Sequence, residues 1–497
     1  MSDNSSRAAS LRDKAIMGED HAPLDPGDLA AYDIDPAEQR ALLRTLDWHI
    51  APVCMVLYLV AFLDRANIGN AAVGGMVKDL NFPANGLSVA TSIFYVTYVL
   101  FETPATMLLR TLRPSRMVPI FVVIWGGVII GNGFATNYAT VVACRLLLGV
   151  CEAGLFPCLV LYMTSFYQRE ELGLRTCYLF IAACLSGVVG GLIATGFLKM
   201  DGLRDLAGWR WLYIIEGALT IVVGIGSFFV IADRYETATY LSERQKFLMM
   251  VRQAKAAVYS RDEGFSWGEF RQYVRDPMIY LSGFVLLCMD TCMYGFRALI
   301  QSTFLVVIIN GLGYSPIVSQ ALSAPVYGWA AIVYLVGALV SDRYSMRYKI
   351  ILPLSLVTIV GYAILVANPA NLGARLFACF LAGMGIYISV GLQVTWLGQN
   401  MAGFRKRSYA IGIQLTMGNI GGVIAGQIYR TNHRPAYTLG HAASLGFWST
   451  AILAATLQYY VWRTRNAHRN ALSAEEKAEM DERGVTGDHH HGFRYVL

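Results

Sequence analysis

Charged residues are scarce in this chain. Only 15% of its 497 residues are Asp, Glu, Lys or Arg, whereas 55% are hydrophobic and the mean hydropathy is +0.45. A soluble domain needs more charge than this to cover its surface, so the composition indicates a polytopic protein of the lipid bilayer. The formal net charge of +6 is modest, and no nucleic-acid partner is expected.

The sequence also lacks the cysteine patterns of disulfide-bonded or metal-binding proteins. The nine cysteines almost all lie in apolar runs, and none forms a C-x-x-C pair. Cys144, Cys151 and Cys158 recur every seven residues, which places small residues along one face of a helix. We therefore expect no disulfide framework and no metal site. Because no nucleophile–base constellation occurs at a water-facing position, we expect neither an enzyme nor a cofactor.

Long apolar runs fill most of the sequence. A helix that crosses the bilayer needs about 20 mostly apolar residues. Twelve such runs occur, approximately at 49–70, 86–110, 116–135, 138–164, 174–198, 209–232, 278–309, 317–340, 349–367, 372–396, 406–430 and 443–463. They predict an all-α membrane protein with twelve transmembrane helices in two pseudo-symmetric six-helix bundles.

The one long polar break, 233–277, sets the expected domain organisation. It is a central loop between an N-terminal bundle at 48–232 and a C-terminal bundle at 278–465. The remaining segments, 1–47 and 466–497, are expected to be polar tails.

The distribution of basic residues predicts the orientation. Lys and Arg concentrate in alternate links and in the tails, and the other links are nearly free of them. Because basic residues favour the cytosolic side, both tails and the central loop are expected there. The protein is expected to be multi-pass, with the plasma membrane as the default location.

An internal repeat relates the two halves. Arg145 and Arg375, which begin the fourth and tenth spans, are separated by nearly the same distance as Arg175 and Arg407, which open the fifth and eleventh. The sequence therefore contains one six-helix unit twice, in the same orientation. This arrangement is typical of carriers in which two halves rock around a site near the middle of the membrane.

Two arginines occupy related positions in this repeat. Arg65, in the stretch AFLDRANIGNA, lies inside the first span, and the repeat maps it onto Arg297 in the seventh. A charge inside a span is costly and normally faces a cavity or a partner. We therefore expect both guanidinium groups to converge on an anionic substrate, a carboxylate that they grip bidentately. The alternative for each is a structural pair or a side chain that reaches out to the membrane surface.

Acidic residues within spans concentrate in the N-terminal half, where Asp64 and Glu152 are expected to carry protons. Asp64 neighbours Arg65, which is expected to hold it ionised, and Glu152 lies seven residues beyond Arg145 on the same helix face. The alternative role for these acids is plain ion pairing. Glu216 is interpreted as structural.

Further polar residues are assigned to the pocket or to a gate. Arg145 and three inward-looking residues complete the expected substrate site: Tyr98, Gln301 and Asn419. Charges near the inner ends of the helices are expected to form a cytosolic gate: Glu102, Asp342, Arg343 and Arg347.

Several stretches carry a resemblance to a known family. LDRANIGNA, FETPA, RLLLGVCEAGLFP, REELGLRTCY, GWRWLYIIEG and the closing GFRYVL resemble the fungal permeases of the anion:cation symporter branch of the major facilitator superfamily, a branch that includes allantoate and nicotinate permeases. The resemblance extends over nearly the whole chain from about residue 38.

More distantly, the sequence resembles the vesicular glutamate and sialic acid carriers of animals. There, arginines on the first and seventh helices hold the anion, and an arginine–glutamate pair on the fourth takes part in proton coupling. The resemblance carries these roles to Arg65, Arg297, Arg145 and Glu152. Thr91 stands where the glutamate carriers have a histidine, so pH sensing by that group is absent.

The resemblance implies a monomeric secondary transporter, without cofactor, whose partners are protons and a small organic anion. Proton-coupled symport by alternating access is the expected function. Export of an acidic secondary metabolite is the alternative, since it uses the same cavity with coupling of the opposite sign.

Overall fold

The computed structural model describes residues 32–111, 113–258, 267–302, 324–344, 346–369, 371–402, 404–429, 437–482 and 487–497. All regular elements in this part of the chain are helices, as the lack of water in a bilayer favours. The first half has these long helices: α3 (Pro36–Val73), α5 (Gly86–Thr111), α6 (Pro114–Gly133), α7 (Tyr138–Glu152), α8 (Leu155–Thr164), α9 (Arg169–Leu198) and α10 (Gly208–Val230).

The second half repeats the plan. Its long helices are α13 (Pro277–Ser302), α16 (Ala324–Tyr344), α17 (Tyr348–Ala367), α18 (Leu372–Gln399), α19 (Phe404–Ile428) and α20 (Thr438–Ala471). Shorter helices complete the described chain: α4 (Met76–Asp79), η1 (Leu203–Asp205), η2 (Tyr235–Thr237), α11 (Glu243–Val258), α12 (Trp267–Val274), α21 (Ala474–Glu482) and η4 (Gly487–His489).

The described helices correspond to the twelve predicted spans when α7 and α8 are counted as one broken segment. Nine of the described segments are long and apolar enough to cross a membrane by themselves, and α5 adds a shorter apolar stretch, Gly86–Glu102. Three predicted spans, 278–309, 317–340 and 406–430, extend into residues outside the described chain. Polar residues inside the apolar stretches of α19 and α20, such as Gln414, Asn419 and His441, lower the hydropathy of these two helices.

Two spans differ from the simplest expectation. The first helix begins well before its apolar run, where the Asp35 side chain accepts a hydrogen bond of 2.9 Å from Ala37 N and Pro36 occupies the first helical position. The fourth span breaks after Glu152, and a new helix starts at Leu155. The break lies beside an acidic residue of the expected site.

The helix pairs show the pseudo-symmetry of the two halves. In the first half the closest packing joins α6 to α10, α3 to α9 and α5 to α7. The corresponding pairs of the second half also pack together: α17 with α20, α13 with α19 and α16 with α18. The internal repeat of the sequence is therefore a repeat of the helix packing.

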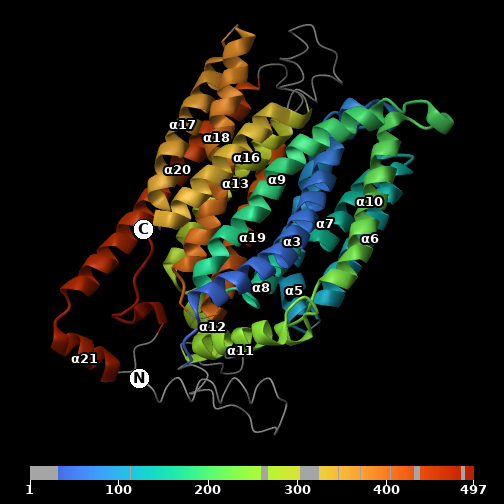
Figure 1. The fold of residues 1–497 in the computed structure, drawn as a ribbon. Helices are drawn as coiled ribbons and strands as arrows, with labels where there is room; N and C mark the ends of the chain where they lie inside the picture. Colours follow the sequence, from blue (N-terminus) through green and yellow to red (C-terminus); the bar gives the residue numbers. More distant parts are fainter. Residues whose placement is uncertain are drawn as a thin grey trace.

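The two halves meet along a few helices. The main contacts join α5 to α19 and α9 to α16, which are equivalent pairs under the repeat, and α3 meets α13 between them. Figure 1 shows α17, α18 and α20 on one side of the molecule, α6 and α10 on the other, and α3, α9, α13 and α19 between these outer groups. The arginine-bearing helices α3 and α13 thus lie next to the contact between the halves.

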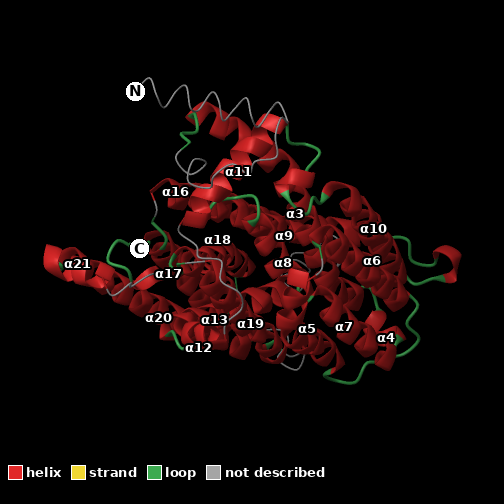
Figure 2. Cartoon of the chain, turned by 90° about the horizontal axis from the view of Figure 1, so that it is seen from below, coloured by secondary structure: helices red, strands yellow, loops and turns green. Residues whose placement is uncertain are grey.

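We call the side at which α3 begins the basic side, because the links there carry most of the Lys and Arg residues. The amphipathic helices α11 and α12 of the central loop lie at this side (Figure 1). Seen from below in Figure 2, α11 lies at the edge of the bundle next to α3. The ion pair between Arg244 Nη2 and Glu38 Oε2, at 2.7 Å, fastens α11 to the start of α3.

Candidate functional site

Arg65 forms a buried ion pair between two helices of the N-terminal half. Its Nε donates to Glu152 Oε2 at 2.7 Å, and the two side chains are 7% and 0% exposed. Arg65 comes from α3, and Glu152 is the last residue of α7. Nη2 of Arg65 and Oε1 of Glu152 have no hydrogen-bond partner among the described residues, so each group keeps polar capacity for a further partner.

Aromatic rings surround this guanidinium group. The Cζ atom of Arg65 lies 4.7 Å from the centre of the Tyr98 ring, 5.0 Å from that of Phe62 and 5.4 Å from that of Phe94. These distances are typical of cation–π contacts. The rings stabilise the buried cation and keep water away from it. Tyr98, predicted for the pocket, therefore lies directly against the arginine.

A glycine allows the helices to come this close. A Cβ atom added at Gly149 of α7 would lie 2.4 Å from the carbonyl oxygen of Phe94 in α5. Only glycine lets the two backbones approach to this distance. Gly149 stands three residues before Glu152, so the close contact fixes the position from which Glu152 reaches Arg65.

Arg297 reaches the same place from the other half of the chain. Its Nη2 donates to the carbonyl oxygen of Phe62 and, at 3.3 Å, to Ser186 Oγ of α9. Its Cζ lies 4.9 Å from the centre of the Phe62 ring, the ring that Arg65 also contacts. The structure therefore brings the two repeat-related arginines together around Phe62, at the contact between the halves.

Arg145 has a different partner from the one its spacing suggested. Its Nη2 donates to the hydroxyl oxygen of Tyr213 in α10 at 3.1 Å, whereas Glu152 pairs with Arg65. Two helical turns separate Arg145 and Glu152 by about 10 Å along the axis, which is too far for a direct bond. Arg145 therefore bonds a residue of α10 and is not part of the Arg65–Glu152 ion pair.

Asp64 does not pair with Arg65, so the expected neighbour contact was wrong. Its Oδ2 accepts hydrogen bonds from Trp125 Nε1 of α6 at 3.1 Å and from Thr220 Oγ1 of α10 at 3.2 Å. Successive residues of a helix point about 100° apart, which turns Asp64 away when Arg65 faces the other half. The carboxyl group lies inside the N-terminal half and is 1% exposed.

Glu102 joins the two halves. Its Oε1 and Oε2 accept hydrogen bonds from Asn419 Nδ2 at 3.1 and 3.2 Å, and Thr416 Oγ1 donates to Oε2 at 3.2 Å. The Oδ1 atom of Asn419 in turn accepts a hydrogen bond of 2.9 Å from Tyr294. Asn419, predicted for the substrate site, is therefore held by the predicted gate residue across the α5–α19 contact.

The basic end of α16 carries a second contact between the halves. Arg347 forms an ion pair with Asp342 and donates to Gln399 Oε1 of α18 at 3.1 Å. A Cβ atom at Gly173 of α9 would lie 2.9 Å from Arg347 Nη2, so this cluster lies against the first half. Arg343, also predicted for the gate, is exposed and stacks instead on Tyr344, with 5.9 Å from Cζ to the ring centre.

A small, mainly apolar cleft lies beside this cluster. It runs between α8 and α9 of the first half and α18 and α19 of the second, and Gly173, Gln399 and Arg407 help to line it. The boundary between the halves is thus hollowed at the basic side, next to the Asp342–Arg347 pair.

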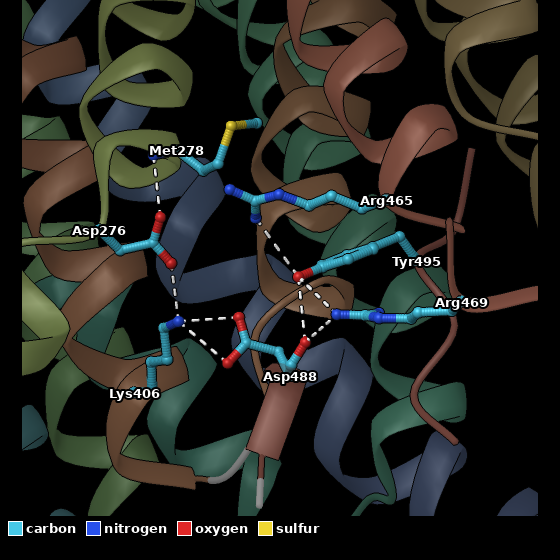
Figure 3. A network of polar contacts seen from close by, with 7 residues as sticks. All are labelled: Asp276, Met278, Lys406, Arg465, Arg469, Asp488 and Tyr495. Atoms are coloured by element: carbon cyan, nitrogen blue, oxygen red, sulfur yellow. Dashed lines mark hydrogen bonds and ion pairs between the residues drawn. The ribbon is translucent and has the colours of Figure 1, made fainter. Parts of the chain in front are cut away.

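A network of ion pairs closes the basic side of the second half (Figure 3). Lys406 Nζ lies 2.7 Å from Asp276 Oδ2 and 2.8 Å from Asp488 Oδ2. Tyr495 donates to the carbonyl oxygen of Asp488, and Arg469 donates to the same oxygen. Residues 487–497 are thereby fastened to the ends of the second-half helices, and Arg347 N donates to Leu497 O at 3.0 Å.

Asp276 precedes the membrane-spanning part of α13, and its pKa lies below the ordinary value of 3.8. Partial burial acts to raise this pKa, but the hydrogen bond and charge of Lys406, with the backbone N–H of Met278, outweigh it. The ionised form of Asp276 is therefore the one that stabilises the fold.

One residue predicted for the site lies outside the described side chains, and three residues that contact the site were not predicted. The side chain of Gln301 lies outside the described residues. The sequence reasoning missed Phe62, which contacts both arginines, and Trp125 and Thr220, which hold Asp64. An aromatic or hydroxyl side chain within an apolar span gives no signal of such a role. Among the described residues, no group of three or more His, Cys, Asp or Glu is arranged to hold a metal ion.

Comparison with known proteins identifies the family. The profile of the Major Facilitator Superfamily matches residues 54–426, and the chain belongs to this superfamily of membrane transporters. An uncharacterized transporter of Schizosaccharomyces pombe is 39% identical over 93% of this chain and 91% of its own length. The high-affinity nicotinic acid transporter of Saccharomyces cerevisiae is 32% identical over 88% of this chain and 80% of its own length.

A solved structure confirms the fold. A bacterial homolog of the human lysosomal transporter Spinster, in an inward-facing and occupied conformation, superposes with a TM-score of 0.59. The match covers 87% of this chain and 98% of that protein at 15% identity, which supports the fold and carries no information on substrate. The predicted fold class and the prediction that the protein is a membrane transporter, with no enzymatic activity, are confirmed.

Proposed function

We propose that this transporter carries a small organic anion, a carboxylate, together with protons by alternating access. The observation that carries the proposal is the position of Arg65 and Arg297. They come from related helices of opposite halves and contact the same Phe62 ring. A carboxylate held between them would bind both halves at once, which couples binding to their relative motion.

The Arg65–Glu152 pair supplies the proton step of this proposal. An arriving carboxylate competes with Glu152 for the Arg65 guanidinium group. Once Glu152 loses its partner, it is a buried charge without compensation, and proton uptake removes that cost. Substrate and proton therefore enter together. Asp64, on the other face of α3, is proposed to hold a proton as well.

The contacts between the halves supply the gates. Glu102 with Asn419 on one interface, and the Asp342–Arg347 cluster against Gly173 on the other, must separate when the halves rock apart. Such polar contacts form or break as discrete units, which suits two alternative states. The basic side is proposed to be cytosolic, since its links carry the Lys and Arg residues, and the plasma membrane is the proposed location.

Nicotinate is the first substrate to test. It is a planar aromatic carboxylate, and the nicotinic acid transporter of Saccharomyces cerevisiae is 32% identical to this chain. Aromatic rings already surround Arg65, and they offer stacking surfaces for a planar anion. Nicotinamide has the same ring and shape without the charge, so it is a matched control for the role of the carboxylate.

The experiment is uptake into liposomes that contain the purified protein. Nicotinate, nicotinamide and a panel of mono- and dicarboxylates are offered with and without an inward proton gradient. The proposal predicts that a carboxylate accumulates when the outside is acidic, and that nicotinamide does not. Glu152→Gln should abolish the accumulation and leave carboxylate exchange intact. Accumulation of the carboxylate that does not depend on the proton gradient contradicts symport. Movement of the carboxylate in the direction opposite to the proton flow identifies an exporter.

A further inference from the structure

A second polar cluster lies on the face of α3 that points away from Arg65. Its members are Asp64 and Asn67 of α3 and Glu216 of α10, which are 1%, 1% and 3% exposed. Within the described residues, none of them forms a hydrogen bond or ion pair with the other half of the chain. The proposed substrate site leaves Glu216 and Asn67 without a role.

Thr220 of α10 links Glu216 to Asp64. Tyr213, Glu216 and Thr220 follow one another at helical spacing on one face of α10. Thr220 Oγ1 donates both to Asp64 Oδ2 at 3.2 Å and to the carbonyl oxygen of Glu216 at 2.8 Å. Glu216 therefore lies one turn from the residue that bonds Asp64. It is adjacent to Asn67 and within electrostatic range of Asp64.

The two acids have unusually few partners. Within the described chain, neither Asp64 nor Glu216 forms an ion pair. Asp64 Oδ1, both carboxyl oxygens of Glu216 and both polar atoms of Asn67 lack a hydrogen-bond partner among the described residues. Buried polar atoms are nearly always satisfied, so a cluster of five that are not is evidence of an additional species.

One proton satisfies four of these five atoms. Two ionised carboxylates buried side by side repel each other and have lost their hydration, whereas a neutral acid has an O–H group to donate. An O–H on Glu216 can donate to Asp64 Oδ1, and its other oxygen can accept from Asn67 Nδ2. The negative charge that remains is shared with the Trp125 and Thr220 donors. Groups this close titrate as a unit.

We propose that Asp64 and Glu216 hold one proton between them, and that Glu216 is a further member of the proton site of the carrier. This inference rests on the proposed proton-coupled function and extends it to a residue of α10. Because Asp64 and Arg65 are neighbours on α3, a movement of α3 on substrate binding changes the surroundings of the pair.

Other ionisable groups stand near the pair without bonding to it. Arg65 of α3 and Glu152 of α7 compensate each other, and Arg145 of α7 bonds Tyr213 of α10. Trp125, the α6 residue that bonds Asp64, does not titrate. From α9, which also packs on α10, the described structure brings no charged side chain up to the pair.

The first test is nicotinate transport by Glu216→Gln in liposomes. The amide preserves the shape and the hydrogen-bonding ability of the side chain but holds no exchangeable proton. We expect accumulation driven by the proton gradient to fall at least about tenfold, the equivalent of one pH unit of driving force, while exchange at equal pH stays within about twofold. Glu236→Gln, an exposed residue of η2, is the matched control and should match the wild type.

The second test needs no transport and so separates this inference from the proposed function. Infrared spectra of purified wild type and of the double variant Asp64→Asn/Glu216→Gln are subtracted at neutral pH. We expect the difference to contain the carbonyl band of one neutral carboxylic acid, in sodium-containing and in sodium-free buffer.

Two results would overturn the inference. One is a difference spectrum that contains only ionised carboxylate bands, because both acids would then be charged and held by a bound cation. The other is an unchanged pH-driven accumulation in Glu216→Gln. If nicotinate and every other carboxylate fail to be transported by the wild type, the proposed function fails, and the infrared result still decides the state of the pair.

Discussion

The two faces of α3 carry acids in opposite electrostatic settings. Toward the other half of the chain, Glu152 is paired with Arg65, and Arg297 contacts the Phe62 ring that Arg65 also contacts. Toward α6 and α10, Asp64 and Glu216 have only neutral donors or no partner within the described chain. One helix therefore separates a compensated site between the halves from an uncompensated one inside the first half.

This difference shows how one helix can serve two tasks. A compensated ion pair is a good place for an anion to compete, because the guanidinium group is already charged and fixed. An uncompensated acid is a good place for a proton, because burial penalises its charge. Since Asp64 and Arg65 are adjacent in sequence, no long pathway is needed to link the two sites.

The largest expected effect comes from breaking the compensated face. Arg65→Gln strands the buried Glu152, and we expect carboxylate uptake to fall below about 1% of wild type, because removing one partner of a buried pair costs about 3–5 kcal/mol. The double variant Arg65→Gln/Glu152→Gln should recover thermal stability, measured by unfolding in detergent, without recovering uptake. Uptake restored in the double variant would show that Arg65 serves only to neutralise Glu152.

Arg297→Gln tests whether the second half contributes to the compensated face. The change removes a charge-assisted donor to the bound anion, so we expect KM for the carboxylate to rise about tenfold with a smaller change in kcat. Ser186→Ala removes only the hydroxyl partner of Arg297 and should stay within about twofold. Equal effects of the two variants would assign Arg297 to packing. Initial rates of uptake measure both.

Stability comparisons sharpen the contrast between the two faces. Glu152→Gln leaves Arg65 unpaired and should lower the free energy of unfolding by about 3 kcal/mol. Asp64→Asn removes an acid that has no cationic partner within the described chain, so we expect a change of less than about 1 kcal/mol. Thermal unfolding in the same detergent compares them, and a larger loss in Asp64→Asn would contradict the distinction.

An effect smaller than that of Glu152→Gln is expected for an acid outside the membrane. Asp276→Asn weakens the contact with Lys406 and should cost about 1–2 kcal/mol while leaving KM unchanged. Because folding lowers the pKa of Asp276, its stabilisation is present above the ordinary value of 3.8 and is lost as the pH falls through the folded value. The difference in free energy of unfolding between the wild type and the variant should therefore be constant from about pH 5 to about pH 8. The two stabilities should converge below about pH 4. A difference that grows as the solution is acidified would contradict this sign.

The helices were predictable because the bilayer imposes a simple length and composition on them. Apolar runs located the spans, and the repeat selected Arg297 as the counterpart of Arg65 before any contact was known. The family resemblance was confirmed by the profile match over residues 54–426.

The partners of the buried charges were harder to predict, because they depend on how each helix is rotated. Sequence adjacency suggested a contact between Asp64 and Arg65, but α3 turns one toward Trp125 and the other toward Glu152. The spacing of Arg145 and Glu152 indicated a shared face but could not show that α7 ends at Glu152, next to another helix's arginine. Glu216 was interpreted as structural, and its place near Asp64 gave no signal in the sequence because the two residues lie on helices far apart along the chain.

The central claim is that Arg65 and Arg297 together hold the carboxylate of the substrate. Equilibrium binding of nicotinate to the purified protein, with nicotinamide as the uncharged competitor, tests it most directly in wild type, Arg65→Lys and Arg297→Lys. The account predicts that each lysine variant binds nicotinate at least about tenfold more weakly, since a lysine cannot make the bidentate contact, and that nicotinamide competes poorly throughout. Wild-type affinity for nicotinate in both lysine variants, or equal competition by nicotinamide, would contradict it.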